Sequence, residues 1–154
     1  MRVVDPVLTE VARPGNTFEV RGPIGGWFVW RGDGPALGMA GGSGVVPLVA
    51  MLRQAIDLGR IDLLRLVVSA RTVAELPFRD ELEAYGTVLL TRERSGSGRL
   101  PSRIGAADLA PLLEDGQTVF VCGSAGFAET ASRALMWLDV DAVRVRVERF
   151  GPTG

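Results

Sequence analysis

Histidine and lysine are both absent from this chain of 154 residues. Without histidine there is no imidazole for a Ser-His-Asp triad, for metal ligation or for acid–base chemistry near neutral pH. Without lysine there is neither a phosphate-loop lysine nor a Schiff-base nucleophile. We therefore expect no metal site, and a function whose chemistry does not depend on these two side chains.

Cysteine occurs once, so the chain cannot form an intramolecular disulfide, which fits a reducing cytoplasm. The 17 basic and 18 acidic residues leave a net charge of −1, which argues against nucleic acid as a partner. Residues 35–52 carry no charge, but they include two prolines and four glycines. A buried strand, a turn and a buried helix explain this stretch better than a membrane span. We expect a cytoplasmic protein with no membrane partner.

Apolar strand patterns alternate with helical patterns from residue 35 onward. The predicted strands cover residues 36–40, 63–70, 87–91, 118–122 and 142–150, and the predicted helices cover 45–58, 78–85, 106–113 and 126–138. Near-continuous apolar strands separated by helices indicate a parallel sheet covered on both faces. Right-handed crossovers then give an α/β fold with an open, doubly wound sheet of about five strands.

The first 34 residues have a different character. They contain short extended patterns, a glycine-rich turn at residues 22–26 and the aromatic run Trp27-Phe28-Val29-Trp30. Residues 31–35 are typical of a linker. We predict a short N-terminal β remnant and linker in residues 1–34, followed by the α/β domain in residues 35–154.

A glycine-rich turn joins the first predicted strand to the first predicted helix. Gly41, Gly42, Ser43 and Gly44 would let the backbone approach a diphosphate, next to the N–H groups of a helix N-terminus. Pro47 suits the first helical turn but stands where the third glycine of the G-x-G-x-x-G fingerprint would be. A tight turn with no ligand is the alternative.

Two further elements follow the fourth and fifth predicted strands. Cys122, Gly123 and Ser124 would put a polarizable thiol at the mouth of a site, with Gly123 leaving room for a flat ring. The alternative is a buried cysteine that packs as a small hydrophobe. Glu148 and Phe150 could orient and shield a redox-active ring, or they could belong to a frayed C-terminus.

Arginines follow the second and third predicted strands. Arg71 ends a Ser-Ala-Arg element, and Thr91 and Arg92 begin a Thr-Arg-Glu element. An arginine fork there could bind an adenosine phosphate through two hydrogen bonds. Solvated surface charge is the alternative.

Taken in order, the elements GPIGG, GGSGVVP, SAR, TRE, CGS and ERFG resemble the ferredoxin–NADP reductase family of flavin- and pyridine-nucleotide-dependent oxidoreductases. The resemblance implies that residues 35–154 form an NAD(P)-binding domain. It implies that residues 1–34 are the last part of a flavin-binding barrel.

The resemblance also assigns roles to residues. It implies that the glycine turn, from Gly41 to Gly44 with Pro47, holds the diphosphate region of the nucleotide. Cys122, in the Cys-Gly-Ser element, would lie beside the nicotinamide carbon that gives up hydride. Glu148 would lie near the nicotinamide, and Phe150 would cover the flavin.

The Thr91-Arg92-Glu93 element resembles the 2′-phosphate grip of family members that use NADP, which indicates NADP over NAD. On the flavin side the resemblance implies roles for Gly22, Pro23, Gly25 and Phe28. The family's R-x-Y-[ST] strand would lie upstream of Met1, and Asp5 stands near the serine of the flavin-diphosphate element. A FAD site would therefore be incomplete in this chain.

The resemblance implies an oxidoreductase that transfers hydride from NAD(P)H to a flavin, which then passes electrons to a ferredoxin, an oxygenase or another acceptor. Its partner would be that redox acceptor or a chain that supplies the flavin barrel. The alternative is a truncated, non-catalytic module that binds NAD(P) or a partner, and an upstream start codon is a third explanation. Exposed Trp27, Phe28 and Trp30 would favour a homodimer or a partner-bound state.

Overall fold

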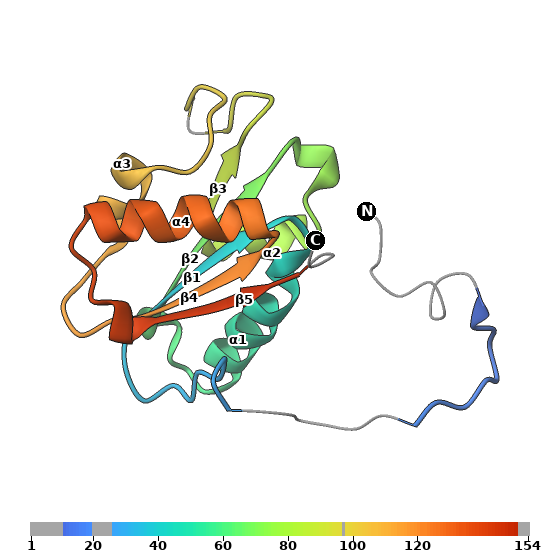
Figure 1. Cartoon of the computed structure of the whole chain (residues 1–154). Helices are drawn as coiled ribbons and strands as arrows, with labels where there is room; N and C mark the ends of the chain where they lie inside the picture. The colour runs from blue at the N-terminus through green and yellow to red at the C-terminus, as the bar shows by residue number, and fades with distance from the viewer. Residues whose placement is uncertain (1–10, 20–25, 97, 151–154) are drawn as a thin grey trace.

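The computed structural model describes residues 11–19, 26–96 and 98–150. Five parallel strands form one sheet in the order β3-β2-β1-β4-β5 (Figure 1). The strands are β1 (Ala36–Gly41), β2 (Leu64–Ala70), β3 (Thr87–Leu90), β4 (Thr118–Gly123) and β5 (Val145–Arg149). The chain proceeds outward from β1 to β3 and then crosses back to β4. This order confirms the prediction of an open, doubly wound α/β fold.

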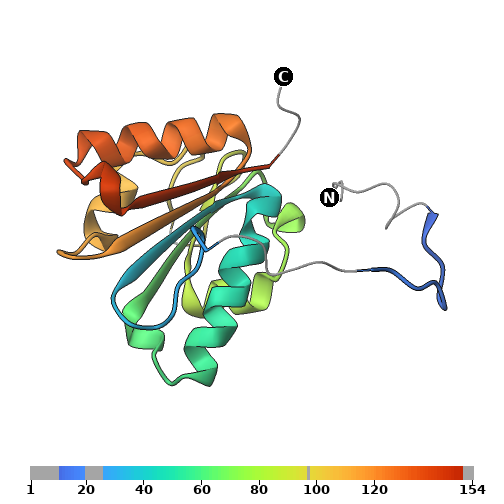
Figure 2. The same cartoon turned by 60° about the horizontal axis from the view of Figure 1, so that its bottom comes forward.

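Helices cover both faces of the sheet, as predicted (Figure 2). They are α1 (Val45–Asp57), α2 (Arg79–Tyr85), α3 (Ala106–Leu109) and α4 (Ala125–Trp137). Leu52 of α1 and Leu82 of α2 belong to the core cluster on one face. Leu109 of α3 and Ala131 of α4 belong to the cluster on the other face. The sheet thus has no solvated face, which explains why its central strands are almost entirely apolar.

Close packing between α1 and the sheet depends on spacing and on one glycine. Leu48, Leu52 and Ala55 recur at helical intervals and are fully buried against the strands. In β1, a Cβ at Gly38 would lie 2.7 Å from Leu66 Cδ2 and 3.2 Å from Leu48. The missing side chain at Gly38 therefore makes room for these two leucines.

Two predicted elements differ from the observed ones by more than one residue at an end. The predicted helix 106–113 becomes α3 and a 3-10 turn over Ala110–Leu112, because Pro111 has no N–H to donate. The predicted strand 142–150 begins three residues later, since Ala142–Arg144 form a 3-10 turn. The Asp141 side chain caps that turn by accepting a hydrogen bond from the N–H of Val143 at 3.0 Å.

The N-terminal aromatic run packs on the α1 face of the sheet. Trp30 is almost fully buried and donates from Nε1 to the carbonyl oxygen of Gly34 at 2.9 Å. The Phe28 ring meets Phe120 edge-on, with centroids 5.2 Å apart. Trp27, at 61% exposure, remains accessible. The exposed apolar patch is therefore smaller than predicted, because Trp30 is buried and Phe28 is partly buried.

The predicted β remnant is not seen in the described part of the N-terminal region. Residues 11–19 and 26–35 contain no strand, because no neighbouring strand pairs with them there. Residues 1–10 and 20–25, where the rest of that prediction falls, lie outside the described residues. Among the described residues, none of the helices has the length and apolar character needed to cross a membrane.

Two valines of α1 test how much burial contributes to stability. Val49 is 2% exposed and Val46 is 53% exposed. We expect Val49→Ala to lower the free energy of unfolding by about 2 kcal/mol, because it removes buried methyl groups. Val46→Ala, the matched control, should change it by less than about 0.5 kcal/mol. Urea denaturation measures both, and equal losses would contradict the assignment of the buried face.

Candidate functional site

A cleft of about 750 Å³ opens at the carboxyl edge of the sheet, within the usual size range for small-ligand sites. Ligands of open parallel sheets bind at this edge, next to the point where the strand order reverses. The residues that line it are Gly41, Gly42, Ser43, Ser69, Ala70, Arg71, Glu75, Pro77, Thr91, Arg103, Ile104, Ser124, Gly126, Phe127, Thr130 and Phe150. The ends of β1 and β2 and the first turns of α4 all contribute.

The turn between β1 and α1 needs its glycines. Gly42 has a φ of +57°, a conformation that L side chains rarely adopt. A Cβ at Gly44 would lie 2.2 Å from the carbonyl oxygen of Cys122, and one at Gly41 would lie 2.4 Å from the Phe127 ring. The backbone of this turn therefore lies directly against β4 and α4.

The first turn of α1 is suited to an anion. No side chain caps its N-terminus, and the first turn contains no acidic residue. Gly42 and Ser43, immediately before the helix, line the cleft. The backbone N–H groups and the helix dipole there favour a negatively charged group such as a diphosphate.

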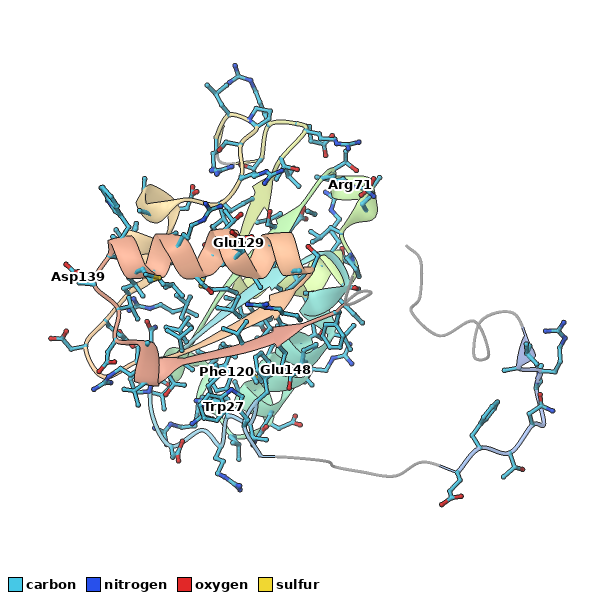
Figure 3. All side chains as sticks on the ribbon, viewed as in Figure 1. Trp27, Arg71, Phe120, Glu129, Asp139 and Glu148 are labelled. Atoms are coloured by element: carbon cyan, nitrogen blue, oxygen red, sulfur yellow. The ribbon has the colours of Figure 1, made fainter. Side chains whose placement is uncertain are left out.

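Two arginines line the cleft. Arg71 lies beyond the end of β2 (Figure 3), and its Nε donates to Glu75 Oε2 at 2.6 Å. Thr91 and Arg103 also line the cleft. Arg92, which the sequence predicts as a nucleotide contact, is not among the lining residues.

A two-bond ion pair shapes the loop that carries Arg103. Arg99 donates from Nε to Asp108 Oδ1 at 2.6 Å and from Nη2 to Asp108 Oδ2 at 2.8 Å. Arg99 also donates to the carbonyl oxygens of Ser102 and Arg103, and Asp108 accepts from the N–H of Gly105. These bonds fix the backbone on both sides of Ile104, which lines the cleft beside Arg103.

Cys122 and Glu148 face each other across β4 and β5. They are register partners in the parallel ladder. Cys122 is fully buried and does not line the cleft, so the predicted exposed thiol at its mouth is not what the structure has. Burial, with a smaller contribution from Glu148, raises the pKa of the Cys122 thiol to about 12. At neutral pH this thiol is therefore protonated, which is a poor state for a nucleophile.

Phe150 reaches the cleft from the end of β5. Its backbone N–H donates to the carbonyl oxygen of Gly123 at 2.8 Å, which extends the pairing of β4 and β5 by one residue. The ring is 39% exposed and lines the cleft. An aromatic ring at this point can stack on a flat ligand group.

Residues 39–133, which include the glycine turn, the Arg71 segment and the start of α4, match the oxidoreductase NAD-binding domain family. The match covers more than half of the chain. The chain belongs to this family. This match confirms the resemblance to an NAD-binding oxidoreductase domain, and solved structures of ferredoxin–NADP reductase-like proteins share its fold.

The NAD-binding domain has several characterised relatives. The chain is 34% identical over 137 residues to a probable dihydroorotate dehydrogenase B (NAD(+)) electron transfer subunit of Methanothermobacter thermautotrophicus, covering 88% of this chain and 49% of the relative. It is 32% identical over 152 residues to an NADPH oxidoreductase of Mycobacterium tuberculosis, covering 93% and 38%.

Among solved structures, the FAD/NAD-binding domain of a Vibrio cholerae nitric oxide dioxygenase superimposes with a TM-score of 0.79. The identity is 21%, and the match covers 98% of this chain and 65% of that domain. This likeness supports the fold. The chain spans 49% of the Methanothermobacter relative and 38% of the Mycobacterium relative, so it corresponds to a part of those proteins.

The residues present fit the NAD(P) that the family binds. The cradle at Gly41 and Gly44 has no space for side chains, the helix N-terminus suits a diphosphate, and two arginines line the cleft. Hydroxyl groups of Ser69 and Thr130 add hydrogen-bonding capacity. NAD(P) is therefore the cofactor of this domain, as predicted.

The structure brings about half of the predicted site residues to the cleft. Those that line it are Gly41, Gly42, Ser43, Arg71, Thr91, Ser124 and Phe150. Those that do not are Phe28, Gly44, Pro47, Arg92, Cys122, Gly123 and Glu148. Gly22, Pro23 and Gly25 lie outside the described residues. Gly44 and Gly123 still affect the shape of the cleft. The backbone of Gly44 packs against Cys122, and that of Gly123 packs against Gly41 and Phe127, which line the cleft.

Sequence reasoning missed Glu75, Arg103, Ile104, Phe127 and Thr130. Phe127 and Thr130 could have been found, because they occupy the first two turns of the helix after the Cys-Gly-Ser element. Arg103 and Ile104 lie in a loop without periodicity. Their position depends on the ion pair between Arg99 and Asp108, nine residues apart, which no local pattern reveals.

The buried thiol leads to a pH-dependent prediction. We expect iodoacetamide to alkylate Cys122 at pH 8 roughly a thousandfold more slowly in the folded protein than in the urea-unfolded chain. The free energy of unfolding should also fall as the pH rises from 9.0 toward 12, because the unfolded chain loses this proton first. Cys122→Ser should lack that part of the pH dependence. Rapid, complete labelling of the folded protein would contradict the assignment.

The Arg99–Asp108 pair leads to a second prediction. Burial opposes ionisation of Asp108, but the hydrogen bonds from Arg99 and Gly105 and the Arg99 charge outweigh it and lower its pKa. Asp108→Asn should cost about 1–3 kcal/mol of unfolding free energy at pH 7. The difference from wild type should shrink as the pH falls below about 4, because Asp108 of the unfolded chain binds its proton there and Asp108 of the folded protein binds it only at lower pH.

Asp115→Asn is the control for Asp108→Asn, since it makes the same chemical change at an exposed aspartate. Chemical denaturation across the pH range measures all three proteins. Equal effects of the two substitutions at pH 7 would show that the ion pair does not support the loop.

Proposed function

We propose that this chain is the NAD(P)H-binding part of a flavin-dependent electron-transfer reductase. The observation that carries the proposal is the cleft itself. It combines a glycine cradle at the N-terminus of α1, two arginines at one end and an exposed phenylalanine at the end of β5. A dinucleotide needs these three kinds of contact, for its diphosphate, its adenosine phosphates and its nicotinamide.

Each group of residues has a separate task in this proposal. The turn from Gly41 to Gly44 binds the diphosphate, and Ser124 at the N-terminus of α4 contacts the neighbouring ribose or amide. Cys122 and Glu148, which pair across the ends of β4 and β5, lie behind the cleft lining at the nicotinamide end, and burial keeps the thiol neutral. Phe150 shields the ring from water. None of these residues has to form a covalent bond.

A flavin supplies the acceptor for hydride and the step from two-electron to one-electron transfer. Phe28, the described residue predicted on the flavin side, packs on Phe120 and does not line the nucleotide cleft. We propose that a flavin-binding barrel, in the same protein or in a partner, completes the reductase. A homodimer through Trp27 remains a prediction.

The names of the relatives support a catalytic role over a non-catalytic nucleotide-binding module. They include electron transfer subunits, an NADPH oxidoreductase and the reductase component of a Ralstonia naphthalene 1,2-dioxygenase/salicylate 5-hydroxylase system. By analogy, the electrons from this protein would go to a partner subunit or an oxygenase component. A sequestering module would not require the Glu148 and Cys122 pair at the nicotinamide end.

We also propose that the site prefers NADPH. Arg103 and Arg71 lie at the end of the cleft where the adenosine would bind, and a 2′-phosphate there can accept hydrogen bonds from a guanidinium. Glu75 already pairs with Arg71. Arg103 is therefore the arginine better placed to respond to a second phosphate.

The test measures nucleotide binding first and flavin reduction second. We expect NADPH to bind the purified chain more tightly than NADH by isothermal titration, and Arg103→Ala to weaken NADPH about tenfold with little effect on NADH. Added FAD should then lose its visible absorbance when NADPH is supplied without air.

The control is Arg94→Ala, an exposed arginine of the same loop outside the cleft lining. It should leave both affinities unchanged. Failure to bind either nucleotide would refute the proposal. Binding without any flavin reduction, even with a flavin-barrel partner added, would favour the non-catalytic module.

A further inference from the structure

One arginine of β5 fastens the N-terminal aromatic segment 27–30 to the sheet. Arg146 Nη1 donates a hydrogen bond to the carbonyl oxygen of Val29 at 2.9 Å. The guanidinium carbon lies 5.7 Å from the ring centroid of Trp27 and 5.2 Å from that of Phe120. A single planar cation thus joins two aromatic rings and a backbone carbonyl.

Arg146 lies on the same face of the sheet as the pair at the nicotinamide end. The register pairs Phe120 with Arg146 and Cys122 with Glu148. Since side chains alternate along a strand, both pairs point to the α1 face, and they are about 7 Å apart along the strands. Figure 3 shows Trp27, Phe120 and Glu148 together on this side of the molecule, away from Arg71.

We propose that Arg146 is a positioning residue for the reductase reaction. By holding segment 27–30 against Phe120, it sets where the preceding part of the chain lies relative to Cys122 and Glu148. This inference rests on the proposed function, in which that pair faces the nicotinamide and the preceding region belongs to the flavin side. Arg146 itself is not among the residues that line the nucleotide cleft.

The guanidinium is suited to this task in ways that other cations are not. It offers several N–H donors in a fixed plane, so one can bind Val29 while the flat faces remain open to rings. Lysine keeps the charge but has no planar group to place between Trp27 and Phe120. The edge-on contact of Phe28 with Phe120 supports the same arrangement from the other side.

The test compares Arg146→Ala and Arg146→Lys with Arg144→Ala in the flavin-loaded protein, with a flavin-barrel partner added if the chain needs one. Arg144 is the matched control, because it lies two residues earlier and lines a separate hollow at the opposite edge of the sheet. Three quantities are measured: amide hydrogen exchange in residues 26–31, the dissociation constant for NADPH, and the rate of flavin reduction at saturating NADPH.

We expect Arg146→Ala to speed exchange in residues 26–31 and to slow flavin reduction about ten- to a hundredfold, as small misplacements of reacting groups do. The NADPH dissociation constant should stay within about twofold of wild type, since the cleft is separate. Arg146→Lys should recover part of the rate, and Arg144→Ala should match wild type in all three.

Unchanged exchange in Arg146→Ala would overturn the inference, as would faster exchange with an unchanged reduction rate. If the wild-type protein reduces flavin and Arg146→Ala reduces it at the same rate, the inference is refuted and the proposed function stands. A wild-type protein that never reduces flavin would refute the proposed function, and the inference with it.

Discussion

The contact between the glycine turn and β4 is the constraint on which the site depends. Gly44 lies so close to the carbonyl oxygen of Cys122 that no side chain fits, and Gly41 lies equally close to the Phe127 ring. This contact sets α1 and α4 with their N-termini at the same edge of the sheet. The positions of the two helix N-termini, and with them the shape of the cleft, therefore have one steric origin.

Arginine makes all the contacts of basic side chains in this protein, because lysine is absent. At one end of the cleft Arg71 binds Glu75, in the loop Arg99 binds Asp108 through two bonds, and on β5 Arg146 meets two rings and a carbonyl. Each of these contacts uses the planar fork, which lysine lacks. An arginine-only chain therefore gains directional contacts, and its positive charges persist far into alkaline pH.

The sequence was sufficient for the parts of the molecule that follow local rules. Apolar periodicity predicted the order of strands and helices, and glycine spacing predicted the turn after β1. The remaining features depend on contacts between distant residues. Arg103 lies in a loop held by the Arg99–Asp108 pair, the backbone of Cys122 packs against a glycine turn about 80 residues earlier, and Trp30 joins the core cluster that includes α1. Tertiary packing decides such positions, and short sequence motifs contain no information about it.

The bond between Arg146 and Val29 joins residues 117 positions apart. The aromatic segment is synthesised well before β5, which holds it. During synthesis Trp27 and Trp30 therefore have no completed surface on which to pack until Phe120 and Arg146 have emerged. Such a long-range contact closes slowly and leaves apolar groups exposed in the meantime. The segment therefore docks only after residues made much later, and its aromatic side chains stay exposed until then.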